Sequence, residues 1–209
     1  MTAGVWEQVF GNPRPVEVEI GPGRGDVLLA FAARRPDVNF FAVEHASGMP
    51  REILARAAGL GLTNVRVVAG DARCVLATCV PDASVTAYHV YFPDPWPKTR
   101  HRTRRLFWGG GFAGELRRTL RRDGRVHVAT DLPSLLAEMR RALLAAGFVE
   151  RAEEKPPAER PRSKFERKYA GQGTWAATFA LPTLDRRRTG LRRGPWRPVR
   201  QLRGLLRGL

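Results

Sequence analysis

Short strand-forming runs alternate with helical stretches of about a dozen residues along most of this chain, which limits its possible folds more than any other feature. Strands separated by such helices pair in parallel, so we expect an α/β fold with a mostly parallel seven-stranded sheet and helices on both faces. The last two predicted strands have no helix between them and should form an antiparallel edge. Asp26 is placed to cap the first helix. We predict strands at 16–20, 39–44, 64–69, 84–92, 124–130, 148–153 and 174–181, and helices at 27–33, 51–60, 112–120 and 133–146.

The length of the chain and its pattern of apolar residues predict one domain with two appendages. A chain of 209 residues fits a single domain, and 43% hydrophobic and 27% charged residues are an ordinary globular composition. The regular spacing of apolar residues ends after Pro182. We therefore expect a short N-terminal arm at 1–15, the folded domain at 16–182 and an Arg-rich, disordered tail at 183–209.

The positive charge of the chain is concentrated in two stretches. Lys and Arg number 36 against 20 Asp and Glu, for a net charge of +16. Residues 98–125 hold ten basic and two acidic side chains, and residues 183–209 hold nine Arg and one Asp. Such confined charge is expected of surfaces that meet a polyanion. The alternative is a set of solvated arginines in an Arg-rich chain, and composition alone does not choose between the two.

Several classes of protein are excluded. No run approaches the ~18 consecutive apolar residues of a membrane span, and the first ten residues lack the basic-then-apolar pattern of a signal peptide. Cys74 and Cys79 are five apart, which fits neither a disulfide framework nor a zinc or redox motif, and the four histidines form no metal-ligand pattern. We expect a cytoplasmic protein with no metal site, no membrane contact and two buried, reduced thiols.

A glycine-rich turn joins the first predicted strand to the first predicted helix. Gly21, Gly23 and Gly25 permit a tight turn and a close approach of a ligand to the backbone. Their spacing is GxGxG, not the GxGxxG of dinucleotide phosphate loops. Glu19, two residues before the first of these glycines, would repel a pyrophosphate. The turn therefore suits a cationic ligand, such as the amino group of S-adenosylmethionine.

Two further carboxylates stand at the ends of the next two strands. Glu44 ends the second strand, where a carboxylate can accept hydrogen bonds from ribose hydroxyls. Asp71 ends the third, where it could accept one from an adenine amino group. Any glycine-rich strand-to-helix turn could look like the first motif alone. Three carboxylates at three successive strand ends favour a nucleoside-cofactor site, because ligands bind at the carboxyl ends of such sheets.

The segment FPDPWPK at 92–98 follows the fourth strand. Its three prolines make the backbone stiff and hold Asp94 and Trp96 in fixed positions beside the predicted site. The cationic run 100–105 follows and could meet several phosphates. The alternative is a rigid surface turn before a solvated basic patch. Trp96 suits stacking on a base and core packing equally well.

FPDPWPK followed by RHxxRR closely resembles the bacterial tRNA (guanine-N7)-methyltransferases. Further matches follow in order from about residue 16 to residue 182: EIGPGRG at 19–25, Glu44, and the segments 70–72, 129–131 and 163–166. The resemblance implies a Rossmann-like class I methyltransferase fold. It also implies that the substrate is the variable-loop guanosine of tRNA, at position 46.

The resemblance also implies the roles of individual residues. Asp94 is the family's assigned active-site residue, and a contact to S-adenosylmethionine. The cofactor would be bound by Glu19, Gly21, Gly23, Gly25, Glu44, Asp71, Ala72 and Asp94. The substrate would be bound by Lys98, Asp131, Ser163, Lys164, Phe165 and Glu166. The RNA would meet Arg100, His101, Arg102, Thr103, Arg104 and Arg105.

Guanine N7 carries an in-plane lone pair at neutral pH, so methyl transfer to it requires alignment and no obligatory general base. We expect Asp94 and Asp131 to accept hydrogen bonds from the N1–H and amino edge of guanine and to offset the positive charge that the purine gains. The expected partner is tRNA, with no obligatory protein partner, and the chain could be a monomer or a homodimer.

The sequence departs from the family in four places, and other functions compete. Ser163 replaces the usual Thr, the run 109–111 is all glycine, the stretch before Val16 is shorter than the N-terminal arm of many relatives, and the tail after Pro182 looks like an addition. The main alternative is a catalytically inactive RNA-binding protein that retains the methyltransferase fold. A nicotinamide-dependent oxidoreductase is disfavoured by Glu19 and the GxGxG spacing. A methyltransferase that acts on protein or a small molecule is disfavoured by the basic patch beside the site.

Overall fold

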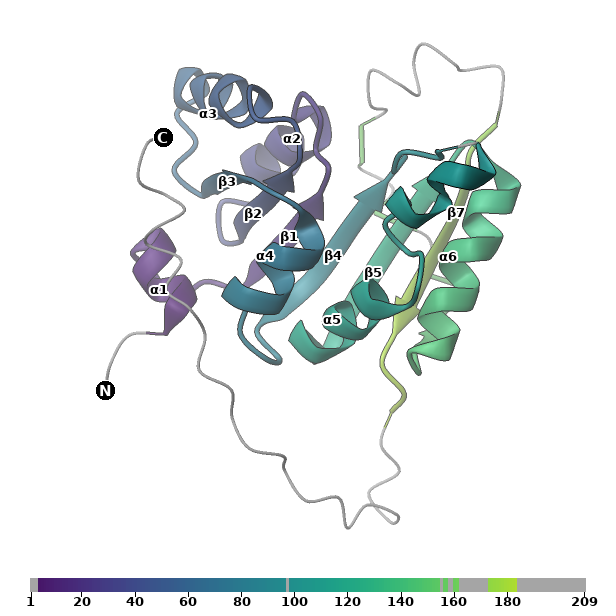
Figure 1. Ribbon diagram of the computed structural model, residues 1–209. Coiled ribbons are helices and arrows are strands. Elements are labelled where there is room, and N and C mark those ends of the chain that lie inside the picture. The colour runs from purple at the N-terminus through teal and green to yellow at the C-terminus, as the bar shows by residue number, and fades with distance from the viewer. Residues whose placement is uncertain (1–3, 97, 155, 158–159, 162–172, 184–209) are drawn as a thin grey trace.

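The computed structural model describes residues 4–96, 98–154, 156–157, 160–161 and 173–183. Its seven-stranded sheet has the order β3-β2-β1-β4-β5-β7-β6; β1 to β5 are parallel, and β7, near one edge, is antiparallel to both of its neighbours, β5 and β6 (Figure 1). This confirms the predicted fold class. The strands are β1 Val16–Ile20, β2 Asn39–Glu44, β3 Val65–Ala69, β4 Val85–Tyr91, β5 Leu120–Thr130, β6 Val149–Glu150 and β7 Trp175–Ala180.

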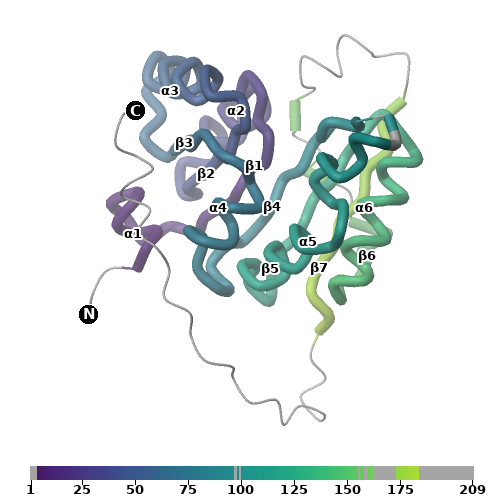
Figure 2. The backbone as a smooth tube through the Cα atoms, in the orientation of Figure 1, coloured from purple at the N-terminus to yellow at the C-terminus, as the bar shows by residue number. Residues whose placement is uncertain are grey.

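Helices cover both faces of the sheet and create two cores. On one face, Leu76, Leu116 and Met139 come from α4, α5 and α6 and pack on the sheet. On the other face, Phe31 of α2 and Ile53 of α3 belong to a second cluster (Figures 1 and 2). The helices are α1 Val5–Phe10, α2 Asp26–Arg34, α3 Met49–Gly59, α4 Ala72–Cys79, α5 Gly111–Thr119 and α6 Pro133–Ala145, with a 3₁₀ helix η1 at Thr99–Arg104.

The described part of the expected N-terminal arm packs as part of the domain. It contains α1, which the sequence did not predict, and α1 buries Trp6 and Phe10. The Trp6 indole N–H donates to the Ser84 hydroxyl at 3.0 Å, and its ring lies 5.2 Å from that of Phe41 between centroids. Buried aromatic surface of this kind makes α1 a part of the core.

Four local expectations are corrected. Asp26 does not cap α2: Gly25 is the capping residue, in a left-handed conformation, and Asp26 is the first helical residue, paired with Arg56. Helix α4 was not predicted, and β6 is two residues long instead of six. Cys74 is exposed, because it faces outward from α4, whereas Cys79 is buried as expected.

No helix in the described part of the chain is long and apolar enough to cross a membrane. Of the Arg-rich stretch 183–209, all but its first residue lies outside the described residues. The expectation of a tail there remains a prediction.

Candidate active site

A cavity of about 690 Å³ lies at the carboxyl ends of the parallel strands. Strands β1 and β4 are neighbours in the sheet although they are not consecutive in the chain, so the connections diverge at this point. Open α/β sheets bind ligands at such a switch point. The cavity is lined by residues at the carboxyl ends of β1 and β2 and by the segment 70–73. Residues 92–94 and 96, together with Thr103, Arg104 and Leu106, complete the lining.

The glycine turn forms the floor of this cavity. Gly21 and Gly23 line it and both have positive φ, at 68° and 55°. Gly25 lies outside the lining and has a packing role: φ is 77°, and a Cβ there would lie 3.0 Å from Ile53 Cγ2. Glycine is required where backbone and neighbour approach this closely. The expected contact of Gly25 with a cofactor is therefore indirect, through the shape of the turn.

Glu44 ties the glycine turn to the end of β2. One carboxylate oxygen accepts the Gly23 N–H at 2.9 Å, and the other accepts the Ala46 N–H at 2.9 Å. Glu44 is buried yet lines the cavity, so it faces the ligand space with its orientation fixed. A carboxylate has about four acceptor positions, which leaves Glu44 able to accept further hydrogen bonds from ribose hydroxyls.

Glu19 precedes Ile20, which lines the cavity, but Glu19 itself lies outside the lining. Its side chain is buried, and Oε2 is without a hydrogen-bond partner among the described residues. Burial raises the pKa of Glu19 to about 8; the positive charge of Arg160 opposes this rise, and the negative charges of Glu44 and Asp26 add to it. A buried carboxylate oxygen without a hydrogen-bond partner costs free energy. A cation or a hydrogen-bond donor that reached Glu19 Oε2 would remove this cost.

Asp71 is shared between the cavity and helix α4. It caps α4 by accepting the Arg73 N–H at 2.8 Å, and it also accepts from the Arg73 guanidinium at 3.2 and 3.0 Å. These hydrogen bonds lower the pKa of Asp71. Three of about four acceptor positions are thus occupied, and one remains for a ligand. Ala72, which was predicted, and Arg73, which was not, also line the cavity. The signal that could have located this helix start is Asp71, because an Asp before an apolar run is a recognisable helix cap.

Asp94 is exposed and lines the cavity in a strained loop. Phe92 and Trp96, the two residues that flank the Pro-Asp-Pro segment, have φ of 50° and 39°. Bulky residues rarely adopt positive φ, and such strain persists only where the surroundings enforce it. The stiffness that the prolines predict is therefore present in the backbone.

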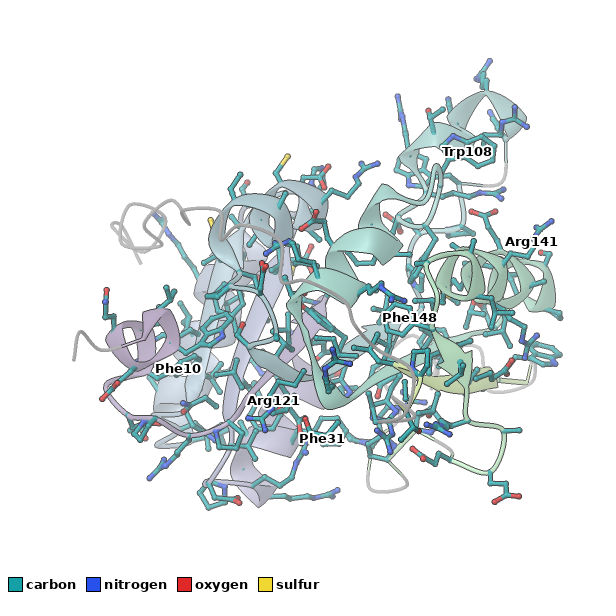
Figure 3. The ribbon with its side chains drawn as sticks, turned by 90° about the horizontal axis from the view of Figure 1, so that it is seen from below. Phe10, Phe31, Trp108, Arg121, Arg141 and Phe148 are labelled. Atoms are coloured by element: carbon teal, nitrogen blue, oxygen red, sulfur yellow. The ribbon has the colours of Figure 1, made fainter. Side chains whose placement is uncertain are left out.

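The basic run lies beside this loop and partly packs on it. Arg104 lies over the Trp96 ring at 4.9 Å, and His101 contacts its edge at 5.8 Å between centroids. Arg102 lies over Trp108 at 4.4 Å, and Figure 3 shows Trp108 on a turn at the periphery, surrounded by nitrogen-bearing side chains. Lys98 and Arg100 are exposed, and Thr103 and Arg104 line the cavity. The run therefore presents cations at the mouth of the site.

The remaining predicted site residues either lie outside the cavity lining or are not among the described residues. Asp131 follows β5, is partly buried and lies outside the cavity lining; Thr130 Oγ1 lies 3.5 Å from its Oδ1. Arg105 directs its guanidinium into the protein, toward Glu138. Ser163, Lys164, Phe165 and Glu166 lie outside the described residues.

The strand order and the cavity at the switch point define a Rossmann-like fold of the class I methyltransferase type. Solved structures with this fold include the 16S rRNA methyltransferase KamB, with a TM-score of 0.63 and 18% identity over 85% of this chain and 93% of that one. The antibiotic-resistance methyltransferase Kmr has a TM-score of 0.58 and 19% identity over 88% of this chain and 96% of that one. At these identities the likeness shows the fold alone.

Sequence comparison identifies the family. Residues 13–177 match the family described as "Putative methyltransferase". A tRNA (guanine-N7)-methyltransferase of Aliivibrio salmonicida is 40% identical over 182 residues, which cover 83% of this chain and 76% of that protein. One of Pseudomonas savastanoi pv. phaseolicola is 40% identical over 181 residues, or 83% of this chain and 74% of that protein. The chain belongs to the tRNA (guanine-N7)-methyltransferase family.

Proposed function

We propose that this protein transfers a methyl group from S-adenosylmethionine to N7 of the variable-loop guanosine of tRNA, at position 46. Membership of the family supports the reaction and the substrate class. The observation that carries the proposal is the single cavity in which the glycine turn, Glu44, Asp71 and Asp94 converge. A cytoplasmic location follows from a tRNA substrate.

The residues around the cavity fit the cofactor. Glu19, whose Oε2 has no hydrogen-bond partner among the described residues, suits the cationic amino group, Glu44 the ribose hydroxyls, and the free acceptor position of Asp71 the adenine amino group. Gly21 and Gly23 allow the cofactor to approach the backbone. When bound, S-adenosylmethionine supplies an electrophilic methyl group, and its sulfur takes up the electron pair of the broken C–S bond as the N7 lone pair forms the new C–N bond.

The contribution of the protein is alignment and charge. N7 has no proton to lose, so no residue is required as a base. Asp94, at the edge of the cavity, and Asp131, at the end of β5, accept from the N1–H and the amino group of guanine. Their negative charge offsets the positive charge that the purine gains. Alignment of this kind is worth about 7–11 kcal/mol of the barrier.

The experiment is methylation of an unmodified tRNA transcript with radiolabelled S-adenosylmethionine, followed by borohydride–aniline cleavage at 7-methylguanosine. We expect cleavage in the variable loop, and none in a matched transcript with adenosine at position 46. Label at another nucleotide would keep the methyltransferase and reject the position. Tight tRNA binding with no transfer would favour the inactive RNA-binding alternative.

A further inference from the structure

Arg105 and Glu138 form an ion pair that the proposed chemistry does not use. Arg105 Nη1 lies 2.5 Å from Glu138 Oε2, and the two side chains are only 24% and 15% exposed. They are separated by 33 positions and lie at different elements: Arg105 is the residue that follows and caps η1, and Glu138 is in α6. An ion pair withdrawn from water contributes little net stability. Stability alone therefore does not account for this pair.

The same guanidinium also holds the strained loop. Arg105 Nη2 donates to the Trp96 carbonyl at 3.3 Å. Trp96 has φ of 39° and is two residues from Asp94. The neighbours of Arg105 act on the same residue, because Arg104 and His101 pack against the Trp96 ring. The ring and the carbonyl of Trp96 are thus both constrained by η1, and η1 is anchored to α6 by Glu138.

The other end of this connection is the element that follows Asp131. Helix α6 begins at Pro133, and the preceding turn is closed by the Leu132 N–H, which donates to Thr130 Oγ1 at 3.2 Å. Figures 1 and 2 show the segment after β4 running past the start of α6 before the chain enters α5. The pair therefore joins the loop that carries Asp94 to the helix that follows Asp131.

We propose that the Arg105–Glu138 pair is a strut, a fixed link that sets the position of Asp94 relative to Asp131. Arg105 and Glu138 are then positioning residues for methyl transfer and not RNA contacts. This inference rests on the proposed function. A displacement of about 1 Å at a reacting centre can cost on the order of 100-fold in rate. Buried atoms on both residues, Arg105 Nε and Glu138 Oε1, have no partner among the described residues, so the link between the two side chains is the Nη1–Oε2 contact.

The test is Glu138→Gln, which removes the charge of a residue that faces the protein interior. We expect a kcat on tRNA lower by about 10- to 100-fold, with the dissociation constants for tRNA and S-adenosylmethionine within two-fold of wild type. Arg105→Gln should lose as much, Arg105→Lys should recover part, and the double variant should be no slower than the single ones. Glu150→Gln, which removes the charge of the β6 residue that pairs with Arg140 of the same helix, is the matched control and should leave kcat unchanged.

A second readout does not depend on activity. The strut predicts faster trypsin cleavage between residues 98 and 105 in Glu138→Gln than in Glu150→Gln. A wild-type kcat and an unchanged cleavage rate in Glu138→Gln would overturn the proposal. So would weaker tRNA binding by Arg105→Gln with Glu138→Gln unaffected, which would make Arg105 an RNA contact. Failure of the wild-type protein to methylate tRNA would instead reject the proposed function, and the cleavage rates would still decide on the strut.

Discussion

Glu17 and His89 meet across neighbouring strands β1 and β4, with Glu17 Oε2 2.8 Å from His89 Nε2. Arg35 donates two hydrogen bonds to the same carboxylate, at 2.8 and 2.9 Å, and the Tyr91 hydroxyl lies 2.9 Å from His89 Nδ1. The His127 ring stacks on His89 at 5.3 Å between centroids. Glu17 is therefore buried in an ionic network whose members do not line the cavity.

This network predicts a loss of stability in acid. Burial opposes ionisation of Glu17, but the hydrogen bond and attraction of His89 and the charge of Arg35 outweigh it and lower the pKa of Glu17 from 4.5 to about 2. The stability from ionised Glu17 is complete above pH 4.5 and is lost as the pH falls toward 2. Burial, with repulsion from His89, lowers the pKa of His127 from 6.5 to about 3, so the unfolded chain binds a proton there that the folded protein does not.

We therefore expect the free energy of unfolding to fall in two overlapping steps, the first below pH 6.5 from His127 and the second below pH 4.5 from Glu17. Urea titrations across this range measure it. His127→Gln should remove the upper step, whereas His45→Gln, at an exposed residue, should leave both. A His127→Gln profile parallel to wild type between pH 6.5 and 4.5 would contradict the assignment.

Gly25 sets the start of α2, and Gly25→Ala should destabilise the protein. A side chain there combines a φ of 77° with a Cβ 3.0 Å from Ile53, and such backbone strain costs about 1–3 kcal/mol. Gly114→Ala is the matched control, because Gly114 lies in α5 with nothing within 4 Å of its Cβ position. That change should stabilise by up to about 1 kcal/mol. Chemical denaturation of both variants decides, and equal stabilities would show that the turn can relax.

The sequence predicts the strands well and the side-chain contacts poorly. The bounds of β1 and β2 match their predictions, because alternation or a continuous apolar run ends at a clear polar or glycine signal. Helix α4 was missed because its eight residues are too few to show a helical period. The three carboxylate positions followed from strand ends. The contacts of Asp71 with Arg73 and of Arg105 with Glu138 depend on how a helix is seated on the sheet, which no local pattern specifies.

Glu19 predicts pH-dependent binding of S-adenosylmethionine. In the free protein, burial raises the pKa of this carboxyl from 4.5 to about 8, so it holds a proton at neutral pH. A cationic amino group favours the ionised form, so binding should release a proton and tighten as the pH rises from 5.5 to 7.5, below the usual α-amino pKa of about 7.7–8.0. Calorimetry in two buffers of different ionisation enthalpy measures the proton. Glu19→Gln should bind more weakly with no pH dependence; an unchanged dependence would assign the proton to another group.

Asp94→Asn and Asp131→Asn should each lower kcat on tRNA by about 10²- to 10³-fold, in the range found when one group that stabilises a transition state is removed. Asparagine keeps the size of the side chain but not its charge. Single-turnover methylation with saturating tRNA and cofactor measures the chemical step. Asp123→Asn, which alters an exposed carboxylate paired with Arg121, is the control and should act at the wild-type rate. Wild-type rates in both test variants would reject a role for these carboxylates.

The basic run should set the salt dependence of tRNA binding. Arg100 and Arg102 are exposed on η1, the 3₁₀ helix whose Thr103 and Arg104 line the cavity, so each can neutralise a phosphate and release a counterion. The slope of log affinity against log salt should flatten by roughly 0.7–0.9 for each arginine replaced by glutamine. Arg66→Gln is the matched control: Arg66 is on the edge strand β3, and its guanidinium donates to the Thr63 and Val65 carbonyls at the start of that strand, away from the carboxyl ends. Filter binding at four salt concentrations measures the slopes, and equal flattening by Arg66→Gln would mean that total charge, not the position of the run, governs binding.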